Sequence, residues 1–280
     1  MPARFPERIV CLTEETTETL YLLGEQRRIV GVSGYTVRPP EARRDKPRVS
    51  AFLSAKTDKI VALEPDLVLG FSDLQADIAR DLAKAGLNVV IFNQRSVDEI
   101  LSMILTLSAM VGAAAKGKRL VARLERNLDR IRAAGRRFAR RPRVYFEEWD
   151  EPMISGIRWV SELVSIAGGE DVFPERARSP GAAGRTIADG AEVIRRAPDL
   201  ILGSWCGKKF RPERVRARPG WDAVPAVRDG ELHEIKSVDI LQPGPAALTD
   251  GVARIHAILS AWNGRLRGQT PVDKSFGLRG

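Results

Sequence analysis

The sequence predicts an α/β protein of two lobes, each built on a parallel sheet, joined by one long spine helix and separated by a ligand cleft. Short β-branched runs alternate with amphipathic helical stretches along most of the chain, a pattern typical of parallel sheets with helical crossovers. The segment from Ile60 to Gly70 matches Val193 to Gly203 without a gap, which indicates a duplicated unit. A long amphipathic stretch lies between the two copies.

The first lobe is expected to cover residues 1–112. Ser96 and Glu99 have the spacing of a capping box, so a helix is predicted from about Val97 to Val111, ended by Gly112. The strand and helix segments before it alternate in the order 8–12, 16–23, 29–32, 57–63, 67–69, 78–85 and 89–92.

The spine helix is expected within residues 113–141, from about Ala113 to Ala139. Its apolar residues recur every three or four positions and predict one buried stripe, with the arginines around the remaining faces. The stripe consists of Leu120, Leu124, Leu128 and Ile131.

The second lobe is expected to cover residues 142–264, and residues 265–280 are expected to be a disordered tail. Each copy of the repeat has a helix end, a Pro-Asp turn, a buried strand and a glycine. A second, weaker similarity relates the segments that begin at Arg8 and Arg143, because each begins a predicted strand that leads to a pair of glutamates. The expected segments are strands 143–146, 200–202 and 232–235, and helices 160–167, 191–196 (capped by Asp189) and 248–263.

Composition argues against several classes of function. The net charge of +9 and the arginine-rich stretches 116–143 and 176–218 allow nucleic-acid binding, but no zinc-finger spacing, aromatic platform or reader motif accompanies them. Cys11 and Cys206 are far apart and indicate neither a disulfide framework nor a zinc site. His233 and His256 are isolated, so no metal site is expected.

No membrane insertion is expected, because no run approaches the roughly 18 apolar residues of a membrane span. Residues 1–8 contain no apolar stretch of signal-peptide length. The sequence as written therefore predicts a cytoplasmic protein, and a periplasmic one if the chain was trimmed at a cleavage site.

The ligand is expected at the loops that follow the strands, because open parallel sheets bind ligands outside the carboxyl ends of their strands. Two facing lobes turn these ends into the walls of one cleft. The candidate residues in these loops are Glu15, Tyr35, Phe71, Asp73, Glu148, Trp149, Trp205, Cys206, Asp239 and Gln242.

Several of these residues have two interpretations. Glu14, Glu15, Glu147 and Glu148 could converge on a cationic or metal-bearing ligand. The alternative is that Glu14 and Glu15 only precede a helix and favour its positive end. Trp149 and Trp205 are either stacking surfaces or core residues. Cys206, close to two lysines, is an activated thiolate, a metal ligand or an inert residue.

Over about residues 8–262, the sequence resembles the helical-backbone (class III) periplasmic-binding-protein-like family, and most closely its cobalamin-binding group among ABC importers. The resemblance implies two Rossmann-like lobes, a rigid connecting helix, a small closure motion and no catalysis. The matching stretches are Gly31–Tyr35 with Pro39-Pro40, Val49–Phe52, Asp58–Leu67, Ile154–Gly156, Ile166–Gly169, and Pro219–Trp221 before Pro225–Val227.

The resemblance also implies roles for single residues. Tyr35, Phe52 and Phe71 match aromatic ligand-facing positions, and Met153 lies near another. The family docks on its permease through one acidic residue on each lobe. The matching positions here are Asp58 and Ala191, with Glu192 next to the latter.

The first functional hypothesis is a monomeric, non-catalytic protein that captures a cobalamin-like corrinoid, without a covalent cofactor and with an ABC permease as partner. The alternative ligands are a ferric siderophore or an organic cation. A cytosolic carrier, a sensor, or an enzyme with Cys206 as nucleophile and Glu148 as base is the second alternative.

Overall fold

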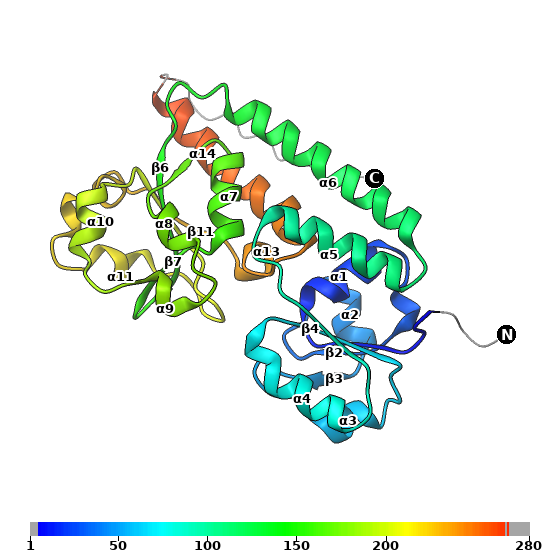
Figure 1. The fold of residues 1–280 in the computed structure, drawn as a ribbon. Coiled ribbons are helices and arrows are strands. Elements are labelled where there is room, and N and C mark those ends of the chain that lie inside the picture. The colour runs from blue at the N-terminus through cyan, green and yellow to red at the C-terminus, as the bar shows by residue number, and fades with distance from the viewer. Residues whose placement is uncertain (1–4, 267, 269–280) are drawn as a thin grey trace.

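The computed structural model describes residues 5–266 and residue 268, which form two lobes below one long helix (Figure 1). The expected tail falls outside the described residues, except for Arg265 and Leu266, which end the last helix, and Gly268. No helix within the described part of the chain is long and apolar enough to cross a bilayer.

The first lobe contains a five-stranded sheet in the order β3-β2-β1-β4-β5, and all its strand pairs are parallel, as predicted. Its strands are β1 (Ile9–Cys11), β2 (Ile29–Ser33), β3 (Arg48–Ser50), β4 (Leu67–Phe71) and β5 (Val89–Phe92). Its helices are α1 (Glu14–Leu22), α2 (Pro40–Asp45), α3 (Thr57–Val61) and α4 (Ala76–Lys84).

The second lobe contains a sheet in the order β11-β10-β6-β7-β9, with β8 beside the start of β6. Its strands are β6 (Arg143–Asp150), β7 (Met153–Ser155), β8 (Glu170–Asp171), β9 (Thr186–Ile187), β10 (Leu200–Gly203) and β11 (Leu232–Glu234). Its helices are α7 (Arg158–Ile166), α8 (Pro174–Ala177), α9 (Ala182–Arg185), α10 (Ala191–Arg196), α11 (Pro212–Arg216), α12 (Pro225–Arg228), α13 (Ser237–Ile240) and α14 (Val252–Leu266), with a π-helical turn at Ala247–Gly251.

The expectation of a purely parallel second sheet is wrong at one edge. β6 pairs in parallel with β10, but β7 runs antiparallel to both β6 and β9. Only Glu151 and Pro152 separate β6 from β7, and a connection this short can only form a hairpin.

The two copies of the sequence repeat occupy equivalent positions in the two lobes. Glu64 and Ala197 lie in the turns that follow the repeated helices and have φ values of 45° and 41°, in the left-handed region that non-glycine residues rarely adopt. The aspartates two residues later make the same contact, because Asp66 accepts from the backbone N–H of Arg8 and Asp199 from that of Arg143. Shared backbone geometry and shared capping of the central strand support a duplicated lobe.

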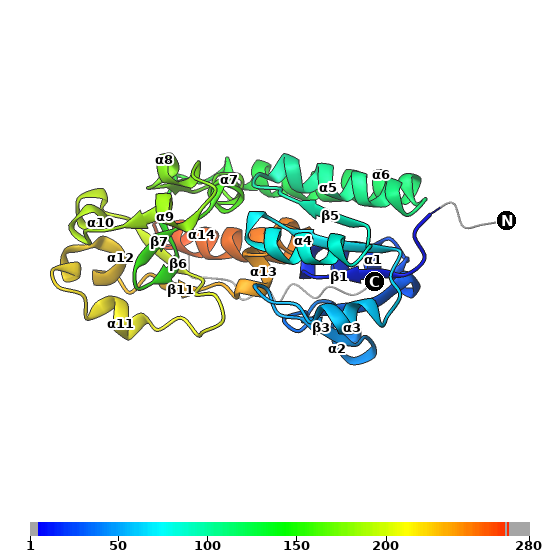
Figure 2. The ribbon, with the colours of Figure 1, turned by 60° about the horizontal axis from the view of Figure 1, so that its bottom comes forward.

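The spine helix is α6 (Ala114–Gly135), which packs against α5 (Val97–Met110) along one side of the molecule (Figure 2). The predicted capping box of Ser96 and Glu99 begins α5. α6 ends four residues before the expected Ala139. Gly135 lies against Gly168, where a Cβ atom would come within 2.8 Å of the Gly168 Cα atom, so the chain leaves the helix at a close backbone contact.

A single apolar cluster runs from one lobe to the other. It includes Leu69 of the first sheet, Leu107 of α5, Leu124 of α6, Phe146 of the second sheet and Ile255 of α14. Because well-packed interiors resist deformation, this shared core restricts movement of one lobe against the other.

Candidate ligand cleft

The first-lobe wall of the cleft presents apolar side chains at the carboxyl ends of its strands. Tyr35 follows β2, Leu53 follows β3 and Leu74 follows β4, and these side chains are 63%, 67% and 58% exposed. Phe52 is half-buried beside them. Exposed large apolar groups that gather at one edge are typical of a binding surface.

Phe71 lies beneath an arginine rather than at the open surface. It is buried, and the Arg95 guanidinium carbon stands 5.0 Å from the centre of its ring. Arg95 also donates to Asp73 and Asn93, while its Nε is buried without a hydrogen-bond partner. Asp73 is therefore an exposed residue that pairs with the more buried Arg95.

The second-lobe wall is charged. Arg185 at the end of α9 is buried and binds both carboxylate oxygens of Glu148. The Lys208 ammonium pairs with Asp150 and lies 3.9 Å from the centre of the half-buried Trp149 ring. The indole of Trp149 thus carries a cation on its face.

Charges on the two walls are close enough to influence each other. The surrounding protein partly desolvates the exposed thiol of Cys206 and raises its pKa, and so does the negative charge of Glu148 from its own lobe and of Glu14 from the other. Burial lowers the pKa of Arg95, and the positive charge of Arg185 across the cleft contributes. These groups therefore lie within electrostatic reach of one another, although they belong to different lobes.

Glu14 and Glu15 of the first lobe are buried, and no cationic side chain forms an ion pair with either among the described residues. Burial raises the pKa of Glu14 and of Glu15 to about 7 each. Glu15 is 1% exposed; its Oε1 accepts from the Thr13 hydroxyl at 2.5 Å, and its Oε2 has no partner. It packs against Gly244, where a Cβ atom would come within 2.4 Å of the Glu15 Cβ, so Glu15 lies behind the wall and not on it.

Glu147 organises the interior of the second lobe. It accepts hydrogen bonds from Tyr145, Trp205 and both terminal nitrogens of Arg218. Trp205 is 2% exposed and packs edge-to-face on Phe210. The indole ring of Trp205 therefore packs inside the second lobe, and little of its surface is available to a ligand.

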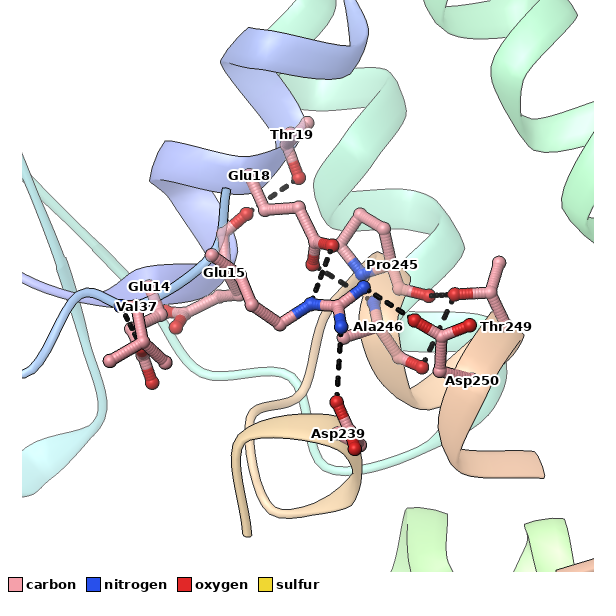
Figure 3. A network of polar contacts seen from close by, with 11 residues as sticks. Glu14, Glu15, Glu18, Thr19, Val37, Asp239, Pro245, Ala246, Thr249 and Asp250 are labelled. Atoms are coloured by element: carbon pink, nitrogen blue, oxygen red, sulfur yellow. Dashed lines mark hydrogen bonds and ion pairs between the residues drawn. The ribbon is translucent and has the colours of Figure 1, made fainter. Parts of the chain in front are cut away.

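Arg38 connects the first lobe to the segment that returns from the second. Its guanidinium donates to Glu18 of α1 at 3.1 Å, to Asp239 of α13 at 3.0 Å and to Asp250 at 2.7 Å. Glu18 in turn accepts from the backbone N–H of Ala246 (Figure 3). Burial and Asp250 raise the pKa of Asp239. Asp239 therefore belongs to the joint between the lobes.

The remaining candidates have distinct positions. Gln242 is half-buried in the same returning segment. Met153 lines a hollow of about 640 Å³ bounded by Trp221, Ile194 and other second-lobe residues. Cys206 is exposed, and its raised pKa argues against an activated thiolate. No cluster of potential metal ligands occurs among the described residues.

The two docking candidates differ in availability. Asp58 is exposed in the first turn of α3. Glu192 binds Arg176 and Arg196, so its charge is neutralised within the lobe.

Sequence reasoning did not identify Arg38, Arg95 and Arg185. Arg95 follows β5 by three residues, so the strand-end rule that selected the other candidates also applies to it. Arg38 and Arg185 lie away from any predicted strand end, and nothing local in the sequence marks them.

Comparisons with known proteins agree with this geometry. The periplasmic binding protein family matches residues 9–238. A vitamin B12-binding protein from Vibrio parahaemolyticus is 25% identical over 248 residues, which cover 86% of each chain. A possible iron-binding (periplasmic solute-binding) protein from Staphylococcus epidermidis superimposes with a TM-score of 0.79 at 20% identity, covering 91% of this chain and 99% of the other. A periplasmic heme-binding protein from Roseiflexus sp. RS-1 gives a TM-score of 0.74 at 25% identity, with coverages of 90% and 99%. Because the match takes in most of the chain and the fold agrees with it, the protein belongs to the periplasmic binding protein family, whose members bind ligands without catalysis.

Proposed function

We propose that the protein is the substrate-binding component of an ABC importer and captures a cobalamin-like corrinoid between its lobes. The observation that carries this proposal is the pairing of an apolar wall, which contains Tyr35 and Phe52, with a charged wall, which contains Arg185 and Lys208. Vitamin B12-binding relatives along most of the chain support it.

A corrinoid matches both walls. Its flat ring has apolar faces, which aromatic side chains cover at a small entropic cost because each has only two torsions. Its periphery carries amide groups and, in cobalamin, a phosphate, which guanidinium and ammonium groups bind by charge-assisted hydrogen bonds.

An anionic iron chelate, such as heme or a ferric siderophore, is a second candidate. Tyr35 presents an exposed phenol, and Arg95 beside the first-lobe wall has a buried Nε without a hydrogen-bond partner among the described residues. The organic-cation alternative was motivated by free cleft carboxylates. Glu147 and Glu148 are both bound by arginines, and Glu14 and Glu15 are buried, so none of these four carboxylates supports it.

Calorimetric and absorbance titrations with cyanocobalamin, cobinamide and hemin test the proposal. Tyr35→Ala should weaken corrinoid binding about tenfold, because one aromatic contact contributes about 1.4 kcal/mol. The control is Leu105→Ala, which removes an exposed apolar residue of α5 and should leave affinity unchanged.

Tyr35→Phe separates the two ligand classes. It keeps the ring, so a corrinoid should still bind, while an iron chelate that uses the phenol oxygen should be lost. Affinity weaker than about 1 mM for both corrinoids would refute the corrinoid, and failure of hemin as well would refute the whole ligand proposal.

We further propose that the protein acts as a monomer and docks on its permease mainly through the first lobe. Asp58 is exposed, whereas Glu192 is occupied by two arginines. A protein that docks on such an importer works on the side of the membrane where the importer collects its ligand.

A further inference from the structure

The positive charge of the protein is concentrated in one segment. Residues 116–141 contain 11 of the 45 lysines and arginines but only two of the 36 acidic residues, Glu125 and Asp129. The remainder of the chain has 34 of each. The whole net charge of +9 therefore originates in α6 and the few residues that follow it.

The fold arranges part of this charge as a straight ridge. The buried stripe of α6 packs against the core, and the opposite face carries arginines at intervals of three or four residues. All four are exposed, and they extend along about 17 Å of the helix, at 1.5 Å per residue. The members of this arginine ridge are Arg119, Arg123, Arg126 and Arg130.

The charges of the ridge are largely uncompensated. The side chains of Arg119, Arg123 and Arg126 form no hydrogen bond or ion pair with any described residue, and Arg130 binds only the neutral amide of Asn127. Asp129 is engaged by Arg132. Like charges four residues apart destabilise a helix, so the ridge contributes nothing favourable to the fold that would explain it.

We propose that the arginine ridge binds the anionic headgroups of a phospholipid bilayer. α6 forms an outer edge of the molecule in both views, so a flat surface can reach it (Figures 1 and 2). The residues between the arginines that are not buried are small, polar or acidic, namely Ala122, Glu125, Asn127 and Asp129, so the contact is electrostatic and does not insert into the bilayer. Single-stranded nucleic acids require a groove with aromatic platforms, which this convex ridge does not provide.

This orientation has a consequence for ligand capture. The elements that carry the cleft loops, such as β4, β7 and α9, lie on the side of the molecule away from α6 (Figure 1). A protein held by the ridge keeps its cleft open to solvent while it stays close to the membrane. The interaction does not depend on which ligand the cleft binds.

Co-sedimentation of the full chain with vesicles tests the ridge. At low ionic strength, the protein should bind vesicles of phosphatidylcholine and phosphatidylglycerol in equal amounts, but not vesicles of phosphatidylcholine alone. The combined substitution Arg119→Gln, Arg123→Gln and Arg126→Gln should weaken binding about 100-fold, because each basic residue adds to the attraction near the surface. High salt should release the wild-type protein.

A matched variant controls for net charge. Arg178→Gln, Arg195→Gln and Arg216→Gln remove three exposed arginines of the second lobe that bind no described residue, and they should leave vesicle binding nearly unchanged. Circular dichroism should show that both variants are folded. Equal weakening by the two variants, no binding to the anionic vesicles, or displacement by a short DNA duplex at a lower concentration than by anionic lipid would each overturn the proposal.

Discussion

Each lobe carries a pair of glutamates toward the carboxyl end of a central strand, and the two lobes surround these pairs differently. Glu14 and Glu15 follow β1, while Glu147 and Glu148 lie in the equivalent strand β6. In the second lobe, Arg218 and Arg185 bind these carboxylates. In the first lobe, Glu15 has a threonine hydroxyl as partner and no cation bound to it.

The difference shows that the duplication preserved the backbone and not the chemistry of the strand ends. A buried carboxylate is tolerated when a cation and hydrogen bonds compensate its desolvation. Without them, the protonated form is favoured, and the pKa values of Glu14 and Glu15 rise to about 7. The same substitution, glutamate to glutamine, should therefore have opposite effects in the two lobes.

The largest expected effect is that of Glu147→Gln. The substitution leaves the half-buried Arg218 without its counter-ion and disturbs the bonds from Tyr145 and Trp205. Breaking a buried pair by removing one partner costs about 3–5 kcal/mol, and urea unfolding measures it. Glu213→Gln, which changes an exposed glutamate of α11, should change stability by less than about 0.5 kcal/mol. Similar losses in the two variants would contradict the role of the buried network.

A smaller effect of opposite sign is expected for Glu15→Gln. The pKa of Glu15 is raised from 4.5 to about 7 in the folded protein, so its contribution to stability is fully present below pH 4.5 and is lost as the pH rises through 7. The amide stays neutral and can still accept the Thr13 hydroxyl. The variant should be about 3 kcal/mol more stable than the wild type at pH 8.

The pH dependence distinguishes this explanation from a simple packing change. The free energy of unfolding of the wild type should fall between pH 5 and 8, and Glu15→Gln should reduce that slope while Glu213→Gln leaves it intact. An unchanged slope would mean that Glu15 is already ionised in the folded protein near pH 5.

Most of the fold could be predicted from the sequence because its signals are local. The capping box of α5, the apolar stripe of α6 and the Pro-Asp turns of the repeat each depend on residues a few positions apart. The strand β7 was missed because it has only three residues, too few for a recognisable alternation. Alternation of strands with helices therefore predicts the parallel strands of a sheet but not an antiparallel hairpin at its edge.

The site was less predictable because its partners lie far apart in the sequence. Arg185 is 37 residues from Glu148, and Arg218 is 71 residues from Glu147. Trp205 shows a second limit. It follows a strand as predicted, but Phe210 fills the space over Gly203 and packs on the indole inside the lobe. Strand-end placement selected the candidate loops, while the direction of each side chain depended on tertiary packing.

The smallest expected effect is on the reactivity of Cys206. It tests whether the two lobes lie as close together in solution as they do in the structure. Cys206 is exposed, whereas burial raises the pKa of Cys11 to about 12, so iodoacetamide should modify Cys206 alone. Glu148 and Glu14 raise the pKa of Cys206 from opposite walls. Removing either charge should lower that pKa and accelerate alkylation about two- to threefold at pH 8, since the thiolate is the reactive form. If Glu148→Gln accelerates alkylation and Glu14→Gln does not, the lobes lie further apart in solution than in the structure. A ligand that closes the lobes should then make alkylation sensitive to Glu14→Gln.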